Sequence, residues 1–283
     1  MAVTGYVYSL SYHRHDIGTW EDAYSYRNVC AKFVRYTIPF AMAYALELIA
    51  YAIADKELSF PQIVVIFLQG GIGPGSYYYP VMLQIVLFFP VIYFFIKKYD
   101  RKGLGFCWFL NVVYEVLQRA WLVSEENYRL LAFRYIFIIA VGCYIAIGKT
   151  KIKRWHSIVA MLVGLAFIIV VNYTGYTPYV IINWTTTSFV GVMYIVPIVM
   201  FLFRRNLHCK ALELLGKASY NIFLTQMAFY GIYPYVPSVF AENTAVHLVY
   251  NIVVCTVLGV LFYLIEDPVT RKIKSWALEK KLW

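Results

Sequence analysis

The sequence predicts an all-α fold, a polytopic transmembrane helix bundle with eight complete spans and a partial helix at the N-terminus. Hydrophobic residues make up 61% of the 283 residues and charged residues only 14%, whereas a soluble domain carries roughly 25% charged residues. Aromatic residues reach 19%, which suits a protein with many helix ends at the membrane interface. We expect one integral membrane domain over residues 1–283.

Eight apolar segments approach the ~20 residues that a helix needs to cross ~30 Å of hydrocarbon. They are residues 36–54, 77–96, 104–121, 130–148, 156–172, 179–203, 216–233 and 245–265. The third is the weakest, because it contains Asn111, Glu115, Gln118 and Arg119. Residues 60–69 are apolar but too short to span, so we expect an interfacial or re-entrant piece there.

Lysine and arginine cluster in alternate loops between these segments. The clusters precede the first span and follow the second, fourth, sixth and eighth: Arg14, Arg27, Lys32, Arg35; Lys97, Lys98, Arg101, Lys102; Lys149, Lys151, Lys153, Arg154; Arg204, Arg205, Lys210, Lys217; Arg271, Lys272, Lys274, Lys280 and Lys281. Because basic loops stay in the cytoplasm, the clusters predict one cytoplasmic side that includes the C-terminus. The exceptions are Lys56, Arg119, Arg129 and Arg134.

The N-terminus does not fit this alternation. Residues 1–12 are apolar and run into the basic residues 13–16, yet twelve helical residues reach only ~18 Å. One interpretation is a short interfacial anchor. The other is that the chain begins inside a helix and lacks the start of that helix.

The same features exclude several classes of partner. The net charge of +10 lies in short clusters between apolar stretches, so we expect a lipid bilayer and no nucleic acid as partner. The five cysteines have no CxxC spacing, which indicates neither a disulfide framework nor a zinc site. His13 and His15 lie in a basic segment that repels metal ions, so no metal site is predicted.

Four separated segments resemble the membrane acyltransferase family called acyltransferase 3. In chain order they are Thr4-Gly-Tyr6, the basic stretch from Tyr26-Arg27 through Lys32 and Arg35 to Pro39, residues 215–226 (LGKASYNIFLTQ) and residues 262–268 (FYLIEDP). They are similar to the family's SGY or SGF element, its fyrkRxxRixP stretch, its LGKxSYxIYLxH helix start and the end of its final helix. Their order and approximate spacing match over essentially the whole chain.

The resemblance implies a ten-helix enzyme of the bacterial inner membrane. Such an enzyme moves an acyl group, typically acetyl, from a cytoplasmic acyl-CoA co-substrate to a hydroxyl of an envelope or exported glycan, with no bound cofactor. On this alignment the chain lacks the family's first helix, which carries the catalytic His, and His13 and His15 lie in the wrong place to replace it. We therefore expect this chain alone to be inactive or nearly so, and an upstream helix, if the gene encodes one, to restore activity.

Arg27, Lys32 and Arg35 are the candidate donor-binding residues. Lys32 and Arg35 are three apart, so they share a face if the stretch is helical. Such cations can hold the phosphates of a nucleotide-bearing donor, because arginine offers a planar fork and lysine a point charge. The alternative is ordinary anchoring by positive charge, since every cytoplasmic loop here is basic.

The candidates for an acceptor pocket are polar residues within or near apolar spans. Glu47, Gln84, Glu115, Arg119 and Arg134 are of this kind, and such residues are costly in a membrane and often functional. Glu115 and Arg119 are four apart and can pair on one helix face. With Arg134 they fall in the outer half, where they suit an extracytoplasmic acceptor sugar. The alternative is a structural ion pair inside the bundle.

Tyr220, Gln226 and Glu266 join the acceptor-pocket candidates because of the resemblance. Gln226 stands where many relatives have His, which leaves an amide in place of a titrating group. Glu266 precedes Asp267 and Pro268, and proline cannot continue a helix interior, so we expect the last span to break there. An alternative interpretation is therefore an ordinary helix stop with acidic residues.

Two other functions remain open. A secondary transporter or exporter would show discontinuous helices in paired halves, and residues 70–75 (GGIGPG) form one such break without a counterpart. A non-catalytic remnant would share the fold of the acyltransferase and differ only in activity. Neither the acceptor nor the oligomeric state follows from the sequence.

Overall fold

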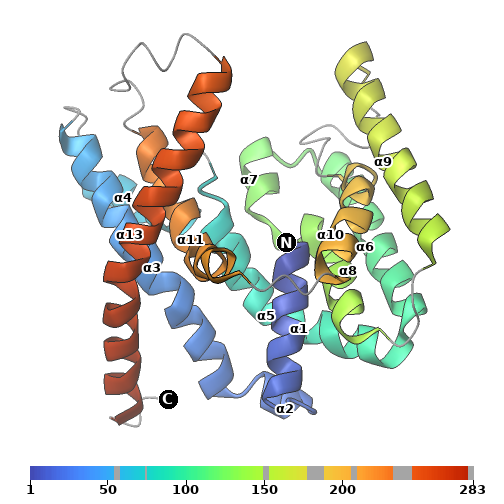
Figure 1. Ribbon diagram of the computed structural model, residues 1–283, viewed down its shortest axis with the longest axis horizontal. Helices are drawn as coiled ribbons and strands as arrows, with labels where there is room; N and C mark the ends of the chain where they lie inside the picture. The colour runs from blue at the N-terminus through green and yellow to red at the C-terminus, as the bar shows by residue number, and fades with distance from the viewer. Residues whose placement is uncertain are drawn as a thin grey trace. The chain divides into compact units, whose positions relative to one another are not determined.

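A computed structural model describes residues 1–53, 58–73, 75–148, 153–176, 188–204, 209–231 and 244–279 (Figure 1). Every regular element within these residues is a helix. Four helical segments are long and apolar enough to cross a membrane: Trp20–Ile53, Tyr78–Tyr99, Arg154–Thr174 and Ala245–Trp276. The shortest has 21 residues, and ~20 suffice for the hydrocarbon core. The chain is therefore a helical membrane protein, as predicted.

The chain divides into two units, which are described separately. Unit 1 comprises Met1–Ser25 and Gln84–Asn206, and unit 2 comprises Tyr26–Leu83 and Leu207–Trp283. The helix α5 (Tyr78–Tyr99) contributes its first residues to unit 2 and the remainder to unit 1.

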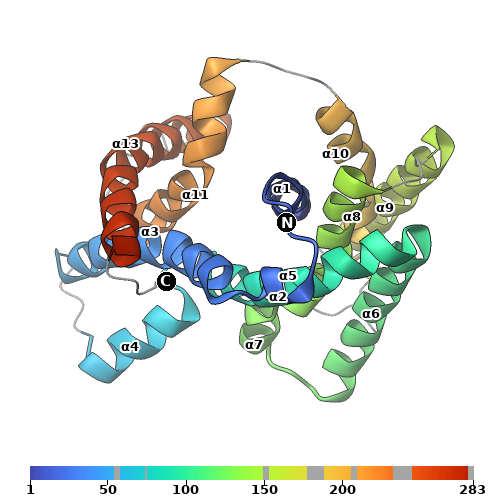
Figure 2. The same cartoon turned by 90° about the horizontal axis from the view of Figure 1, so that it is seen from below.

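Unit 1 is organised around the close approach of α1 to α8 (Figures 1 and 2). Its elements are α1 (Ala2–Arg14), α2 (Trp20–Ala23), the remainder of α5, α6 (Arg101–Ala120), α7 (Glu125–Leu130), η1 (Ala132–Tyr135), α8 (Ile136–Ile147), α9 (Arg154–Thr174), η3 (Gly191–Tyr194) and α10 (Ile195–Arg204). A Cβ atom on Gly5 would overlap the carbonyl oxygen of Ile139, and one on Gly142 would overlap that of Ala2. Only glycine therefore allows the two backbones to touch.

The N-terminal residues are packed inside unit 1. The side chains of Tyr8 and Tyr12 are buried, and their rings meet Phe89 of α5 edge-on at centroid distances of 5.1 and 5.2 Å. An interfacial anchor would keep one polar face in water. The packing on α5 and α8 therefore favours a helix inserted into the unit over a surface anchor.

The predicted fourth span, 130–148, is interrupted by a break at Leu131, which has extended backbone between α7 and η1. Gln84 of α5 holds this break. Its side-chain nitrogen donates to the carbonyl oxygen of Leu130 at 2.7 Å, and its side-chain oxygen accepts from the backbone N–H of Ala132 at 3.0 Å. The helix that follows, α8, has only 12 residues. Because Gln84 is distant in sequence, the local pattern did not reveal the break.

Some predictions fall outside the described residues. These are residue 54 of the first predicted span, Pro74 of the segment 70–75, residues 179–187 of the sixth span, residues 232–233 of the seventh, and the cations Lys56, Lys149, Lys151, Arg205, Lys280 and Lys281. The described end of the sixth segment consists of η3 and the 10-residue helix α10.

Unit 2 is built on α11 (Lys210–Gly231), which packs against both α3 (Tyr26–Ile53) and α13 (Thr244–Glu279). A Cβ atom on Gly259 of α13 would overlap Ile222 of α11, so this crossing is also close. The short segment predicted at residues 60–69 is the helix α4 (Phe60–Gln69). A capping box at Ser59 starts it, and Gly70, with φ of 97°, ends it.

The helix α13 runs through Pro268, so the predicted break is wrong. Proline has no N–H and leaves the carbonyl of the residue four before it without its usual partner. Side chains one turn apart hold the helix together here. Asp267 pairs with Arg271 at 2.8 Å, and the Thr270 hydroxyl donates to Glu266. These contacts span the proline and are visible only once the helix is known to continue.

Candidate functional site

The helices of unit 2 that carry the acyltransferase-like segments meet in a buried polar cluster. We call it the α3–α11–α13 cluster; it comprises Tyr36, Tyr220, Asn221, Glu266 and Thr270. The Tyr220 hydroxyl donates to the backbone carbonyl of Tyr36 at 3.1 Å, and the two rings meet edge-on at 5.4 Å. Residues from three segments far apart in the sequence thus lie together.

Glu266 is the buried carboxylate of this cluster, with 4% of its surface exposed. Its Oε2 accepts a hydrogen bond from Asn221 Nδ2 at 3.0 Å, and its Oε1 accepts one from the Thr270 hydroxyl. Both oxygens are therefore satisfied, as a buried carboxylate requires. Sequence reasoning identified Tyr220 and Glu266 but missed Asn221 and Thr270. The spacing of Glu266 and Thr270, four residues on one helix, was the available signal.

The predicted donor-binding cations lie on α3 just before the cluster. Arg27 and Arg35 are exposed and Lys32 is half-buried. Because the stretch is helical, Lys32 and Arg35 share a face as expected. Tyr36 directly follows Arg35, so about 14 Å of helix holds all three cations and the first residue of the cluster.

These cations differ from their basic neighbours in unit 2. Lys217 pairs with Glu213 on α11 at 2.8 Å, and Arg271 pairs with Asp267 on α13 at 2.8 Å. Within the part of the chain that the structure describes, Arg27 and Arg35 form no such ion pair. Their charge is available to an anionic ligand.

Gln226 lies on α11, five residues beyond Asn221 and therefore about 7.5 Å along the helix. Its side-chain nitrogen donates to the Tyr230 hydroxyl at 3.4 Å, within the same helix. Gln226 is not one of the residues that hold Glu266.

The other acceptor-pocket candidates lie in unit 1, around a second buried carboxylate. Glu115 is 1% exposed, and its Oε1 accepts a hydrogen bond from the Tyr128 hydroxyl at 2.7 Å. The guanidinium of Arg134, which is 2% exposed, lies 4.8 Å from the ring centroids of both Tyr128 and Tyr135. Arg134 is also close enough to Glu115 to act on it electrostatically. Tyr128 thus links the carboxylate to the cation.

Arg119 was the predicted partner of Glu115, but the carboxylate takes the hydroxyl of Tyr128 from α7 instead. Arg119 is half-exposed on α6. Helix spacing can propose only a partner on the same helix, so it could not identify Tyr128.

One face of α6 also carries polar atoms that no described residue hydrogen-bonds. They are Asn111 Nδ2, the Tyr114 hydroxyl and Gln118 Oε1. With Glu115 they form what we call the α6 stripe, with spacings of three and four residues that place them on one face. Each unmet group costs ~1–3 kcal/mol unless a ligand or water satisfies it. All three atoms are buried, so the unmet groups of the stripe lie inside unit 1.

No family model matches the chain, and no curated protein and no solved structure matches it either.

Proposed function

We propose that the protein is a membrane O-acyltransferase of the acyltransferase 3 type, which moves an acyl group, acetyl by preference, from a cytoplasmic acyl-CoA to a hydroxyl of an envelope or exported glycan. The observation that carries this proposal is the α3–α11–α13 cluster. Three segments that resemble the family's motifs are distant in sequence, yet Tyr36 contacts Tyr220 and Asn221 contacts Glu266.

In this proposal the donor binds at the start of α3. Arg27 and Arg35 are exposed and unengaged by acidic side chains in the described residues, so they can grip phosphates in a bidentate manner. Lys32 adds a point charge on the same face as Arg35. Glu266, with both oxygens satisfied, fixes α11 against α13 and acts as a positioning residue.

The α6 stripe is the candidate for the acceptor site in this proposal. The unmet groups of Asn111, Tyr114 and Gln118 can hydrogen-bond the hydroxyl groups of a sugar. Because these groups are buried, a sugar reaches them only when α6 separates from its neighbours. In the reaction of this class, a hydroxyl oxygen of the acceptor bonds to the thioester carbon and the carbon–sulfur bond breaks. The hydroxyl proton ends on the departing sulfur, so that CoA leaves as a thiol.

The direct test is transfer of labelled acetyl from acetyl-CoA to glycan in membrane vesicles that carry the protein as its gene encodes it. We expect labelled glycan, and a KM for acetyl-CoA that rises about tenfold or more in the Arg27→Gln, Arg35→Gln variant, because each charged contact contributes ~1.5–3 kcal/mol. The matched control is Lys97→Gln, Lys98→Gln. Glycan that stays unlabelled, or an equal KM rise in the control, would contradict the proposal.

We further propose that the protein has eight spans plus α1, a cytoplasmic C-terminus and a location in the bacterial inner membrane. The support is the alternation of basic loops. Cys209, an exposed cysteine just before α11, tests the sidedness. A membrane-impermeant maleimide should label it in inverted vesicles and leave it unlabelled in right-side-out vesicles; the reverse pattern would refute the orientation.

A non-enzymatic exporter is the second candidate. The observation that favours it is the turn after α4, where Gly70, Gly71 and Gly75 all have positive φ. Helices interrupted at glycine or proline are common at the binding sites of transporters. Substrate flux into liposomes without consumption of acyl-CoA would favour the exporter over the transferase.

A further inference from the structure

Glu47 is a third buried carboxylate, and it belongs to neither the α3–α11–α13 cluster nor the α6 stripe. It lies in the second half of α3 with 5% of its surface exposed. Its Oε2 accepts a hydrogen bond from the backbone N–H of Ile72 at 2.9 Å. A Cβ atom on Gly71, where φ is +109°, would lie 2.7 Å from that oxygen. The glycine turn therefore closes tightly on the carboxylate and tolerates no side chain there.

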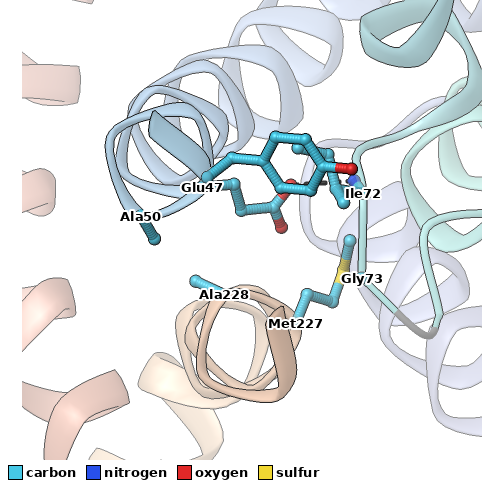
Figure 3. A pocket seen from close by; sticks show the side chains of 7 residues that line it. Glu47, Ala50, Ile72, Gly73, Met227 and Ala228 are labelled. Atoms are coloured by element: carbon cyan, nitrogen blue, oxygen red, sulfur yellow. Dashed lines mark hydrogen bonds between the residues drawn. The ribbon is translucent and has the colours of Figure 1, made fainter. Parts of the chain in front are cut away.

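The carboxylate faces a small cavity between α3, the glycine turn and α11 (Figure 3). The cavity is lined by Glu47, Ala50, Tyr51, Ile72, Gly73, Met227 and Ala228. Its volume of about 10 Å³ matches one small polar group, since a water molecule needs roughly that much room. Apart from Glu47 and Tyr51, the walls are apolar or backbone.

Only one oxygen of Glu47 is engaged. Oε2 takes the Ile72 N–H, and no described residue donates to Oε1. In Figure 3 the carboxylate points into the space bounded by Met227 and Ala228. The lone pairs of Oε1 are therefore available to a group in the cavity that can donate a hydrogen bond.

The lining selects the kind of donor. A metal ion needs several oxygen ligands, and the described residues contain no group of three His, Cys, Asp or Glu that could hold one. An ammonium has three protons to satisfy, against one carboxylate here. A hydroxyl needs a single acceptor, and the carbon that bears it suits walls such as Ala50 and Met227.

The surroundings indicate a lipid-soluble alcohol in particular. The helix α4, which runs into the glycine turn, has no buried residues and exposes Phe60, Val64, Val65 and Leu68. Tyr44 of α3 holds α4 in place by donating to the carbonyl of Ile63 at 2.8 Å. The exposed apolar helix α4 thus leads directly into the turn that contacts the carboxylate. We propose that Glu47 binds the hydroxyl of a long-chain alcohol, in a site separate from those of the proposed transfer reaction.

Photoaffinity labelling tests this site directly and needs no enzymatic activity. The probe is a long-chain alcohol with a diazirine in its chain, added to membranes that contain the protein, with adducts located by mass spectrometry. We expect labelling near Glu47 that an unmodified alcohol of the same length reduces about tenfold, whereas the alkane without the hydroxyl does not. Labelling that the alkane reduces equally would overturn the proposal.

Two variants sharpen the result. Glu47→Gln weakens the acceptor and Ala50→Leu fills the cavity, so both should lower the labelling severalfold. Glu213→Gln, at an exposed carboxylate near the start of α11, is the control and should leave the labelling unchanged. Equal labelling in wild type and Ala50→Leu would contradict the site even if the Glu47 variant did not fold.

Discussion

Two buried carboxylates, Glu115 in unit 1 and Glu47 in unit 2, are held in opposite ways. In unit 1, Glu115 is 1% exposed and takes the Tyr128 hydroxyl, with the guanidinium of Arg134 against the Tyr128 ring. In unit 2, Glu47 is 5% exposed, but its partner is a backbone N–H and its second oxygen faces a cavity. Charged residues are rare inside membrane spans, so sequence reasoning treats both glutamates as candidates for a functional role.

The difference teaches that burial alone does not identify a binding residue. A carboxylate enclosed by side chains from α7 and η1 stabilises the contact between those elements. A carboxylate held by one backbone group, beside a cavity, retains an acceptor for a ligand. We therefore expect Glu115 to matter most for stability and Glu47 most for binding.

The largest effect is expected where unit 1 is most tightly closed, at Gly142. Leucine there places its Cβ onto the carbonyl oxygen of Ala2, and because backbone cannot move aside easily, we expect a loss of about 3 kcal/mol or more in the free energy of unfolding. Unfolding in mixed micelles measures it. Gly105→Leu is the control, since nothing lies within 4 Å of that position; equal losses would show that the α1–α8 contact is not tight.

Glu115→Ala should lower the free energy of unfolding by about 3 kcal/mol, because it leaves the charge of Arg134 buried without the carboxylate. Glu47→Ala should cost only about 1 kcal/mol, for the lost partner of the Ile72 N–H. The same unfolding measurement on both variants checks the comparison. A larger cost at Glu47 than at Glu115 would reverse the assignment of roles.

Tyrosine hydroxyls give a finer test within unit 1. Tyr128→Phe removes the hydrogen bond to Glu115 and should cost about 2 kcal/mol, as expected for a bond to a charged group. Tyr114→Phe removes a buried hydroxyl that no described residue hydrogen-bonds, so it should cause no loss of stability and can raise the free energy of unfolding by up to ~1–3 kcal/mol. If the two variants change the free energy of unfolding equally, the Tyr128–Glu115 hydrogen bond does not stabilise unit 1.

The smallest effect concerns Cys209, which precedes α11 and is exposed. The backbone N–H groups of Leu212 and Ala211 hold the pKa of its thiol below the ordinary value. The thiolate is the reactive form, so a lowered pKa leaves more of it at neutral pH. Alkylation rates followed against pH should rise with a midpoint below the ~8.5 of a free cysteine. Cys209→Ser gives the alkylation of the other cysteines. A midpoint at or above ~8.5 would contradict the lowered pKa of Cys209.

Much of the fold followed from the sequence, because apolar length and helix capping are local properties. The span 77–96 lies within α5 except for its first residue, and the segment 60–69 is α4 with its capping box. The break at Leu131 was not predictable, because it depends on Gln84. The continuation through Pro268 was missed because a general rule about proline was weighed without the Asp267–Arg271 pair.

The sequence likewise identified some residues of the candidate site and missed others. Tyr220 and Glu266 followed from a sequence resemblance, and the structure places them in one cluster. Asn221 and Tyr128 were missed, because their contacts join different helices. Spacing rules apply along one helix, so cross-helix partners need coordinates.

The basic residues at the end of α5 in unit 1 and at the start of α3 in unit 2 also differ in their surroundings. At the end of α5 in unit 1, Lys97 lies over the Tyr93 ring at 5.7 Å and Lys98 over the Tyr99 ring at 5.2 Å. At the start of α3 in unit 2, Arg27 and Arg35 are exposed and lead into the α3–α11–α13 cluster. Anchoring by positive charge predicts that the two ends are equivalent, whereas donor binding predicts that they differ.

Equilibrium binding of acetyl-CoA to the purified protein tests this central claim most directly. We predict that Arg27→Gln with Arg35→Gln weakens binding about tenfold or more, because each lost charged hydrogen bond contributes ~1.5–3 kcal/mol, and that Lys97→Gln with Lys98→Gln leaves the affinity within about twofold. Equal affinities in the two double variants, or no binding to the wild-type protein, would contradict the account.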